Sequence, residues 1–364
     1  LVSSYNGLTQ ATHLLLQKLG HTVTVEFATN EALILDALTA FRPDLVICSF
    51  LKEFVPVAVF EQCKVFIVHP GVIGDRGPSS LDWALLQGKK EWGTVVVEAC
   101  EKFDEGPVWA FRGYEVPQGI TKSRLYNEFH SKAALEAVQE AVVNFRAARR
   151  GAFEPAIVDF DSPQVPGRKM PLMKQADCTI DWAMDTTADI VRKVASRDGQ
   201  PGVLDVFEGK TVYLYGAHPD GFLTGAPKTI LATRHGAVCL GTVDGAVWIT
   251  HMRASKLRQD SGGPAGSAPK FCKLPAVRVL SEQLGLSLEC VGESHAGLAL
   301  APRETWQDIV YVKRGEVGFV LFQIYNGACS VEISQRLTAC LRHAKAQMDT
   351  EVIVVAGGGV LTNH

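Results

Sequence analysis

The sequence lacks a long apolar run and any marked excess of charge of one sign. Its apolar stretches, such as 352–356, fall far short of the roughly 20 residues that a membrane-spanning helix needs. The 36 Lys and Arg residues nearly balance the 39 Asp and Glu residues, for a formal net charge of −3. The overall charge therefore indicates neither a nucleic acid partner nor a membrane surface.

Paired cysteines are also missing. The nine cysteines include no CxxC arrangement, and an odd number cannot all form disulfides within one chain. Several lie in apolar runs, for example Cys48 in "LVICSF" and Cys239 in "AVCL". This pattern predicts buried, reduced thiols in a cytoplasmic protein and no metal site.

A secretion signal is not recognisable at the start of the chain. Leu1 leads into "LVSSYNG" without a charged segment, an apolar run and a cleavage site. We expect that a few strand residues precede Leu1. At roughly 150 residues per domain, 364 residues correspond to about two and a half domains.

The first 150 residues alternate helical and strand patterns. Asn30 is a suitable N-cap for a helix over 31–41, and Gly20 is a suitable end for the helix before it. The expected helices are 8–19, 31–41, 79–88 and 122–150, and the expected strands are 21–27, 45–50, 64–69 and 93–99. Such alternation predicts βαβ units and a parallel sheet, which binds ligands at the carboxyl ends of its strands.

The pattern changes after residue 150. Residues 151–171 are rich in Pro and Gly and read as a linker. One helix over 186–196 and several short strands then predict a small β-barrel or β-sandwich, followed by a poorly structured insertion at 258–271. A strand, a turn, a helix over 331–348 and another strand end the chain. The domains expected are 1–155, 156–280 and 305–364, with 281–304 as a linker.

The segment "FIVHPGVIGDRGPSSLDWALLQG" carries the strongest indication of function. His69 ends a predicted buried strand, and Asp104 lies in a tight loop after the next strand. A carboxylate that orients an imidazole and favours its protonated form permits general acid–base catalysis. From spacing alone, a hydrogen-bonded structural histidine is the more common alternative.

Two motifs together resemble those of the N10-formyltetrahydrofolate-dependent formyltransferases: "HPG…DRGPSSLDWA" and "FDEGPVWA". The segment "CTIDWAMDTTADIVRKVASRDGQPG" is similar to that family's entry into its second domain. The resemblance implies that His69 and Asp104 flank the formyl carbon. Where the family has an Asn in "N-x-H-P", this chain has Ile67, which cannot donate a hydrogen bond. Asn6 is our candidate for the missing donor, with a capping role as the alternative.

The resemblance also implies where the folate binds. It places the pterin ring at Phe54 and Val55. Ordinary packing in the core would account for these two apolar residues almost as well. Arg76 can bind a carboxylate or phosphate, although a solvated loop arginine is as common. The remaining expected folate-binding residues are in the same loop: Gly77, Pro78 and Ser79. We expect Ser79 or Ser80 to cap the next helix.

The last segment distinguishes among branches of the family. "GEVGFVLFQIYNGACS" and "TEVIVVAGGGVLTNH" resemble the start of a crotonase, or enoyl-CoA hydratase/isomerase, fold. A Rossmann-like α/β formyltransferase domain, a small β-barrel domain and the start of a crotonase, in that order, resemble the HypX (HoxX) family of hydrogenase maturation proteins. That resemblance implies formyl transfer from N10-formyltetrahydrofolate to coenzyme A, followed by decarbonylation of formyl-CoA to the carbon monoxide ligand of [NiFe]-hydrogenase.

The resemblance makes the second step doubtful for this chain. A crotonase oxyanion donor would follow the "GGG-x-x-x-N" pattern at Asn363, and His364 replaces the family's Gly, so most of the decarbonylation site is missing. The sequence gives only weak support for Cys329 as a nucleophile, because no partner base is visible.

Two other functions remain open. A methionyl-tRNA formyltransferase-like enzyme needs a basic second domain, whereas residues 168–283 hold 15 Lys and Arg against 11 Asp and Glu. A non-catalytic folate- or CoA-binding module is favoured by Ile67 and the incomplete last segment.

Overall fold

The computed structural model describes residues 1–51, 54–255, 272–288, 304–324 and 329–357. These residues form two compact units. The first comprises Leu1–Ile120 and Arg124–Met173, and the second comprises Thr121–Ser123 and Lys174–His364. The predicted insertion at 258–271, Asn363 and His364 lie outside the described residues.

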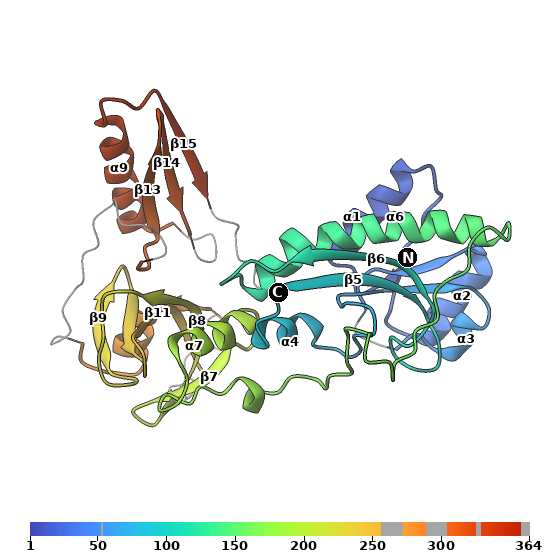
Figure 1. Cartoon of the computed structure of the whole chain (residues 1–364), viewed down its shortest axis with the longest axis horizontal. Coiled ribbons are helices and arrows are strands. Elements are labelled where there is room, and N and C mark those ends of the chain that lie inside the picture. The colour runs from blue at the N-terminus through green and yellow to red at the C-terminus, as the bar shows by residue number, and fades with distance from the viewer. Residues whose placement is uncertain (52–53, 256–271, 289–303, 325–328, 358–364) are drawn as a thin grey trace, which may run out of the picture. The chain divides into compact units, whose positions relative to one another are not determined.

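The first unit is built on a four-stranded sheet beside a small parallel pair (Figure 1). The pair is β1 (Val2–Ser3) and β2 (Glu26–Phe27). The sheet contains, in order, β3 (Val46–Cys48), β4 (Val65–His69), β5 (Glu91–Glu98) and β6 (Val108–Glu115). The α/β Rossmann-like class expected from the sequence is therefore confirmed, but the expected strand over 21–27 is reduced to its last two residues.

The sheet is mixed rather than parallel throughout. β3 and β4 run parallel, whereas β5 is antiparallel to both of its neighbours. The helix between β4 and β5, α4 (Ser80–Leu86), has seven residues and rises only about 10 Å. Because β5 is antiparallel to β4, the chain re-enters the sheet at the edge at which β4 ended.

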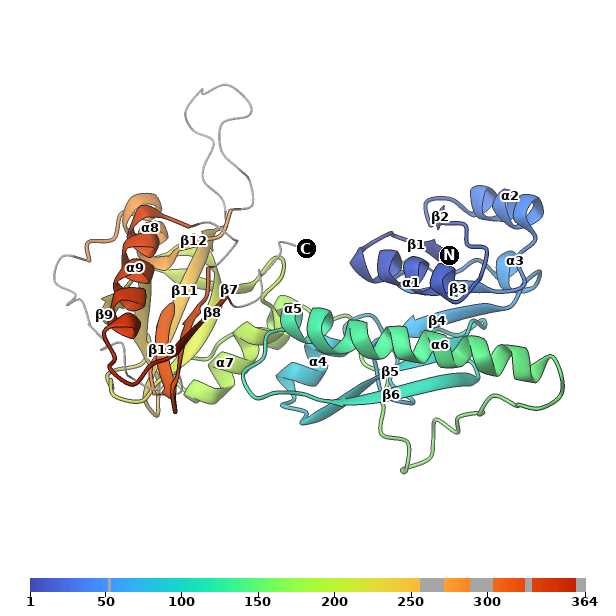
Figure 2. The same ribbon diagram turned by 90° about the horizontal axis from the view of Figure 1, so that it is seen from above.

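The helices cover the sheet as their apolar faces require. They are α1 (Gly7–Lys18), α2 (Glu31–Phe41), α3 (Val57–Phe60), α4, α5 (Lys122–Arg124), the π-helical η1 (Leu125–His130) and α6 (Ser131–Ala148). Asn30 caps α2 as predicted, accepting hydrogen bonds from the N–H groups of Ala32 and Leu33. Helix α6 lies along β5 and β6 (Figure 2), and its small residues Ala134, Ala137 and Ala141 allow close packing on that sheet.

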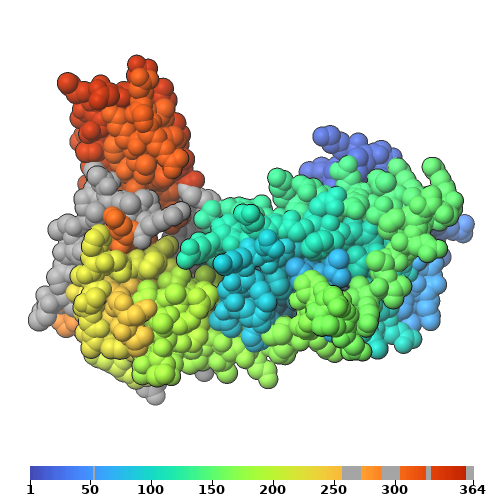
Figure 3. Space-filling model, viewed as in Figure 1, coloured from blue at the N-terminus to red at the C-terminus, as the bar shows by residue number. Residues whose placement is uncertain are grey.

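Residues 156–173 belong to the first unit, although the sequence suggested that the second domain begins at 156. Their backbone is hydrogen-bonded to that unit: Ala156 pairs with Val108, and the N–H of Gly167 donates to the carbonyl of Ile73 at 3.0 Å. In Figure 3 these residues, in light green, form part of the surface of the first unit. Pro and Gly spacing predicts an irregular path, but not what the path packs against.

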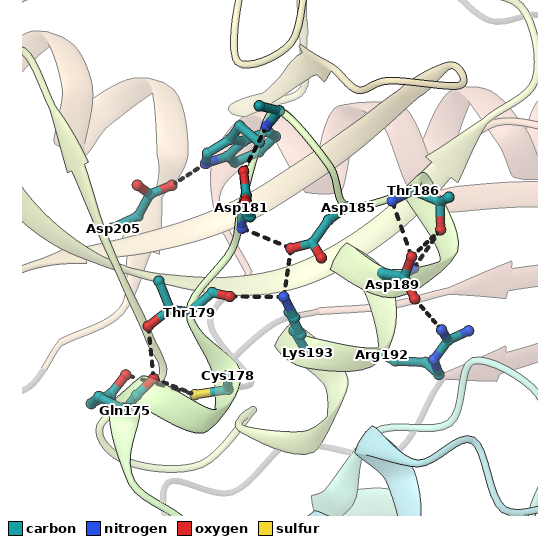
Figure 4. Close-up of polar contacts among 12 residues, drawn as sticks. Gln175, Cys178, Thr179, Asp181, Asp185, Thr186, Asp189, Arg192, Lys193 and Asp205 are labelled. Atoms are coloured by element: carbon teal, nitrogen blue, oxygen red, sulfur yellow. Dashed lines mark hydrogen bonds and ion pairs between the residues drawn. The ribbon is translucent and has the colours of Figure 1, made fainter.

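The second unit opens with a short polar framework (Figure 4). It contains the 3₁₀ turn η2 (Gln175–Cys178) and α7 (Thr187–Ser196). Thr186 and Asp189 form a capping box at the start of α7. Lys193 binds both the Asp185 carboxylate, at 2.5 Å, and the carbonyl of Thr179, at 2.8 Å. These contacts fix the "IDW" segment of the predicted domain entry.

An antiparallel sheet follows, in the order β7-β8-β11-β10-β9 with β12 beside β11. Its strands are β7 (Val203–Phe207), β8 (Lys210–Asp220), β9 (Ile230–Arg234), β10 (Ala237–Gly241), β11 (Ala246–Ala254) and β12 (Leu274–Pro275). Helix α8 (Ala276–Arg278) and the π-helical η3 (Val279–Gln283) follow β12. Leu280 and Leu284 are buried in the core of this sheet, so the first residues of the expected linker are structured.

A smaller sheet ends the described chain. It comprises β13 (Ile309–Arg314), β14 (Val317–Phe322) and β15 (Val352–Gly357), with α9 (Val331–Lys345) joining the parallel strands β14 and β15. This strand–helix–strand order agrees with the sequence. None of the eight cysteines among the described residues forms a disulfide, and Cys48, Cys178, Cys239 and Cys340 are buried.

Candidate active site

His69 is fixed at the end of β4 by the turn that follows it. The carbonyl of Pro70 accepts hydrogen bonds from Ser80 Oγ at 2.6 Å and from Trp92 Nε1 at 2.9 Å. Ser80 therefore holds this turn instead of capping α4. The His69 side chain is 6% exposed, so little of the imidazole is in contact with water.

Two carboxylates contact the imidazole of His69, one at each nitrogen. Asp75 Oδ2 lies 2.7 Å from Nε2, which is hydrogen-bond distance. Asp104 Oδ1 lies 3.5 Å from Nδ1, which is an ion-pair contact but too long for a strong hydrogen bond. The pair predicted from sequence, His69 and Asp104, is thus brought together, but Asp75 makes the closer contact. The sequence analysis missed Asp75 as a site residue, and its position six residues after His69 was the available signal.

Asp104 reaches His69 by a different route from the one predicted. The sequence placed both residues at the ends of adjacent parallel strands. In the antiparallel pair, however, His69 is opposite Val95, and the last residue of β5, Glu98, is opposite Phe66. The loop after β5 therefore begins about 10 Å back along β4 and must extend along the sheet. Asp104 adopts a left-handed conformation with φ +59°, and the N–H of Gly77 donates to its Oδ2 at 3.2 Å.

The two carboxylates increase the affinity of the His69 imidazole for a proton. Burial lowers the pKa of His69, but the charges of Asp104 and Asp75 and the hydrogen bond to Asp75 outweigh burial, so the pKa lies above its usual value. Behind it, His130 Nδ1 lies 2.7 Å from Thr94 Oγ1. Burial, with a contribution from His69, lowers the pKa of His130 to about 3, which leaves that ring neutral.

Asn6 makes the contacts of a helix cap. Its Oδ1 accepts a hydrogen bond from the N–H of Thr9 at 3.1 Å, and its Nδ2 donates to Tyr126 Oη at 2.7 Å. These bonds agree with the capping alternative and leave one Nδ2 hydrogen for another acceptor. Ile67 is half-buried among apolar side chains and offers no donor.

The two residues expected in the pterin slot differ in environment. Val55 is buried in the core around β3 and β4, as the core-packing alternative requires. Phe54 is 37% exposed, and its ring centroid lies 4.7 Å from that of Phe103, which is 62% exposed. Phe103 directly precedes Asp104, so an apolar surface borders the acid–base pair.

The residues of the "DRGP" loop have mostly structural contacts. Arg76 Nη1 binds Glu105 at 2.7 Å, and its guanidinium lies 4.4 Å from the Phe160 ring centroid. Ser79 lies at the N-cap position of α4 but makes no side-chain cap; its Oγ accepts from the N–H of Met173 at 3.1 Å. Pro78 is exposed. Gly77 is the loop residue that contacts Asp104 directly.

Comparisons with known proteins agree with this fold. Residues 15–142 match the formyl transferase model, and residues 172–261 match the formyl transferase C-terminal domain model. The chain therefore belongs to the formyl transferase family.

Its relatives include hydrogenase maturation proteins. The chain is 36% identical over 358 residues to hydrogenase maturation factor HoxX of Bradyrhizobium diazoefficiens, covering 98% of this chain and 58% of that protein. The crystal structure of HypX from Aquifex aeolicus in complex with tetrahydrofolic acid is 37% identical and superposes with a TM-score of 0.82, covering 98% of this chain and 59% of that one. Human mitochondrial 10-formyltetrahydrofolate dehydrogenase is 25% identical over 60% of this chain and 24% of that protein.

The chain spans just under three fifths of the length of its HoxX and HypX relatives. Among the described residues, no helix is long and apolar enough to cross a membrane.

Proposed function

We propose that this chain transfers the formyl group of N10-formyltetrahydrofolate to coenzyme A, giving formyl-CoA, as the first step toward the carbon monoxide ligand of [NiFe]-hydrogenase. The observation that carries the proposal is the buried His69 with a carboxylate at each nitrogen, in a chain related over 98% of its length to a HypX crystallised with tetrahydrofolic acid.

The reaction needs a proton to move from the acceptor to the leaving group. As the thiol sulfur of coenzyme A attacks the formyl carbon, His69 takes the thiol proton. The bond between the formyl carbon and N10 then breaks, and His69 returns that proton to N10. One C–S bond forms and one C–N bond breaks. Asp104 stabilises the imidazolium between the two transfers.

The apolar surface next to Asp104 suits the folate. Phe54 and Phe103 offer exposed aromatic faces beside the acid–base pair, and aromatic rings pack well against planar heterocycles. We assign the pterin contact to Phe54 and, from its position, to Phe103, and we retain Asn6 as the candidate donor to the formyl oxygen.

The strand–helix–strand segment of β14, α9 and β15 supports the choice of acceptor. We infer that it is the start of a crotonase fold, a family that binds acyl-CoA thioesters. A crotonase segment has no evident use in modifying tRNA, so coenzyme A is favoured over an initiator tRNA as acceptor. Decarbonylation would require residues outside the described part of the chain.

The test is direct. Purified protein is incubated with N10-formyltetrahydrofolate and coenzyme A, and formyl-CoA and tetrahydrofolate are measured by chromatography and mass spectrometry. We expect both products in equal amounts. Formylation of methionyl-tRNA without formyl-CoA would favour the second function, and folate binding without either product would favour the non-catalytic module.

A further inference from the structure

The two carboxylates at His69 lie on opposite sides of the ring and in different surroundings. Asp75 is 3% exposed and contacts Nε2 at 2.7 Å, so it lies on the interior side. Asp104 is 13% exposed and contacts Nδ1 at 3.5 Å, so it lies on the side nearer to solvent. A ligand that reaches the imidazole from outside therefore meets Nδ1 first.

We propose that Asp75 is the positioning residue for His69: it holds the Nε2–H tautomer and directs Nδ1 toward Asp104 and the reacting formyl group. A carboxylate can only accept a hydrogen bond, so Nε2 must carry the hydrogen in this contact. In the neutral ring, Nδ1 is then the basic nitrogen. Asp104 then does not hold the ring in place. It interacts instead with the proton on Nδ1, the nitrogen that faces the reacting formyl group. This inference rests on the proposed function for the identity of the reaction.

The contact between Asp75 and His69 is built into the fold. A Cβ added at Gly71 would lie 2.4 Å from Asp75 Oδ2 and 2.7 Å from His69 Cδ2, so only glycine leaves room for the pair. On the other side, a Cβ added at Gly167 would lie 1.8 Å from the backbone nitrogen of Asp75. The turn at Gly71 thus closes on the carboxylate of Asp75, and the segment at Gly167 closes on its backbone.

The other titratable groups around the pair do not supply its charge. His130 is neutral, because burial lowers its pKa to about 3. Burial and the charge of Asp75 raise the pKa of Tyr114 beyond its usual value, so the phenol keeps its proton. Among the described residues, the negative charges that act on His69 are those of Asp75 and Asp104.

The catalytic step places the proton on one nitrogen. The acceptor S–H gives its proton to Nδ1 as sulfur attacks the formyl carbon, and Nδ1–H returns it to N10 when the C–N10 bond breaks. Nε2–H stays bound to Asp75 throughout. If the ring rotated, Nδ1 would move away from the acceptor thiol, and the two groups would no longer be aligned for proton transfer.

The experiment measures the ring itself. In ¹⁵N-histidine-labelled full chain, ¹H–¹⁵N correlation spectra report the tautomer and pKa of each histidine, and a His69→Gln variant identifies the His69 signals among the ten. We expect a neutral Nε2–H tautomer and a pKa above the usual value of about 6.5. Asp75→Asn should lower that pKa by roughly one to three units, because one of two neighbouring negative charges is lost.

A control variant and a kinetic measurement distinguish a positioning role of Asp75 from a purely structural one. Asp198→Asn neutralises an equally buried carboxyl of the second unit and should leave the His69 pKa unchanged. Asp75→Asn should reduce kcat by about 10²- to 10⁴-fold, with little change in the KM for folate. The acid limb of its pH–rate profile should move to lower pH, following the pKa of His69.

Each outcome decides the question. An Nδ1–H tautomer in the wild-type protein overturns the proposal, even if Asp75→Asn does not fold. A folded Asp75→Asn variant with an unchanged His69 pKa also overturns it. Wild-type protein with the expected tautomer but no formyl transfer would instead refute the proposed function and leave the positioning role standing.

Discussion

The N–H of Gly77 is hydrogen-bonded to the carboxylate of Asp104. Replacing Gly77 by Ala tests whether this contact determines the position of Asp104. Its φ is +116°, where an L-residue costs about 1–3 kcal/mol. A Cβ there would lie 2.2 Å from the carbonyl oxygen of Met170, so residues 168–173 must also shift. Overpacking of this kind costs about 1–3 kcal/mol, and the two effects together should lower the free energy of unfolding by about 2–6 kcal/mol.

The assay combines stability and activity. Since 1 kcal/mol corresponds to about 2–4 °C for units of roughly this size, the Tm of Gly77→Ala should fall by roughly 4–24 °C in a thermal melt followed by circular dichroism. At a temperature where the variant is folded, kcat for formyl transfer should fall as well, because the N–H of Gly77 no longer holds Asp104 Oδ2 at 3.2 Å.

Gly119→Ala is the matched control. Gly119 also has a positive φ, +73°, but a Cβ there meets no atom within 4 Å. It should lower stability by backbone strain alone, about 1 kcal/mol, and leave kcat unchanged. Equal losses of Tm in the two variants would refute the clash with Met170. An unchanged kcat in Gly77→Ala would refute the role of this N–H in placing Asp104.

Three further predictions follow from the same contacts. His69→Ala should abolish formyl transfer while folate still binds, as isothermal titration calorimetry would show; surviving turnover would contradict the acid–base role. Asn6→Ala should lower kcat far more than folate affinity if its remaining N–H stabilises the formyl oxygen, whereas equal losses, with a lower Tm, would identify a cap only. Asn30→Ala should cost about 1 kcal/mol of stability and leave kcat unchanged, because it removes the cap of α2 far along the chain from His69; an unchanged Tm would contradict the cap.

The sequence by itself determined the local elements and the main catalytic candidate. Apolar spacing and Asn30 located α2 to the residue, because helix period and capping are encoded in neighbouring positions. The continuous apolar run of β4, broken by Pro70, placed His69 at a strand end for the same reason. These signals require no knowledge of distant contacts.

Only the tertiary structure decided what surrounds His69. The antiparallel direction of β5, the strand β6 that the sequence analysis overlooked, and the extension of the first unit to Met173 all depend on pairing between distant segments. The close contact of Asp75 depends on the turn at Gly71, and that of Asp104 on a loop that extends back along the sheet. Local patterns predict which residues can form a strand or a turn, whereas the direction of pairing and the closure of a loop are set by long-range packing.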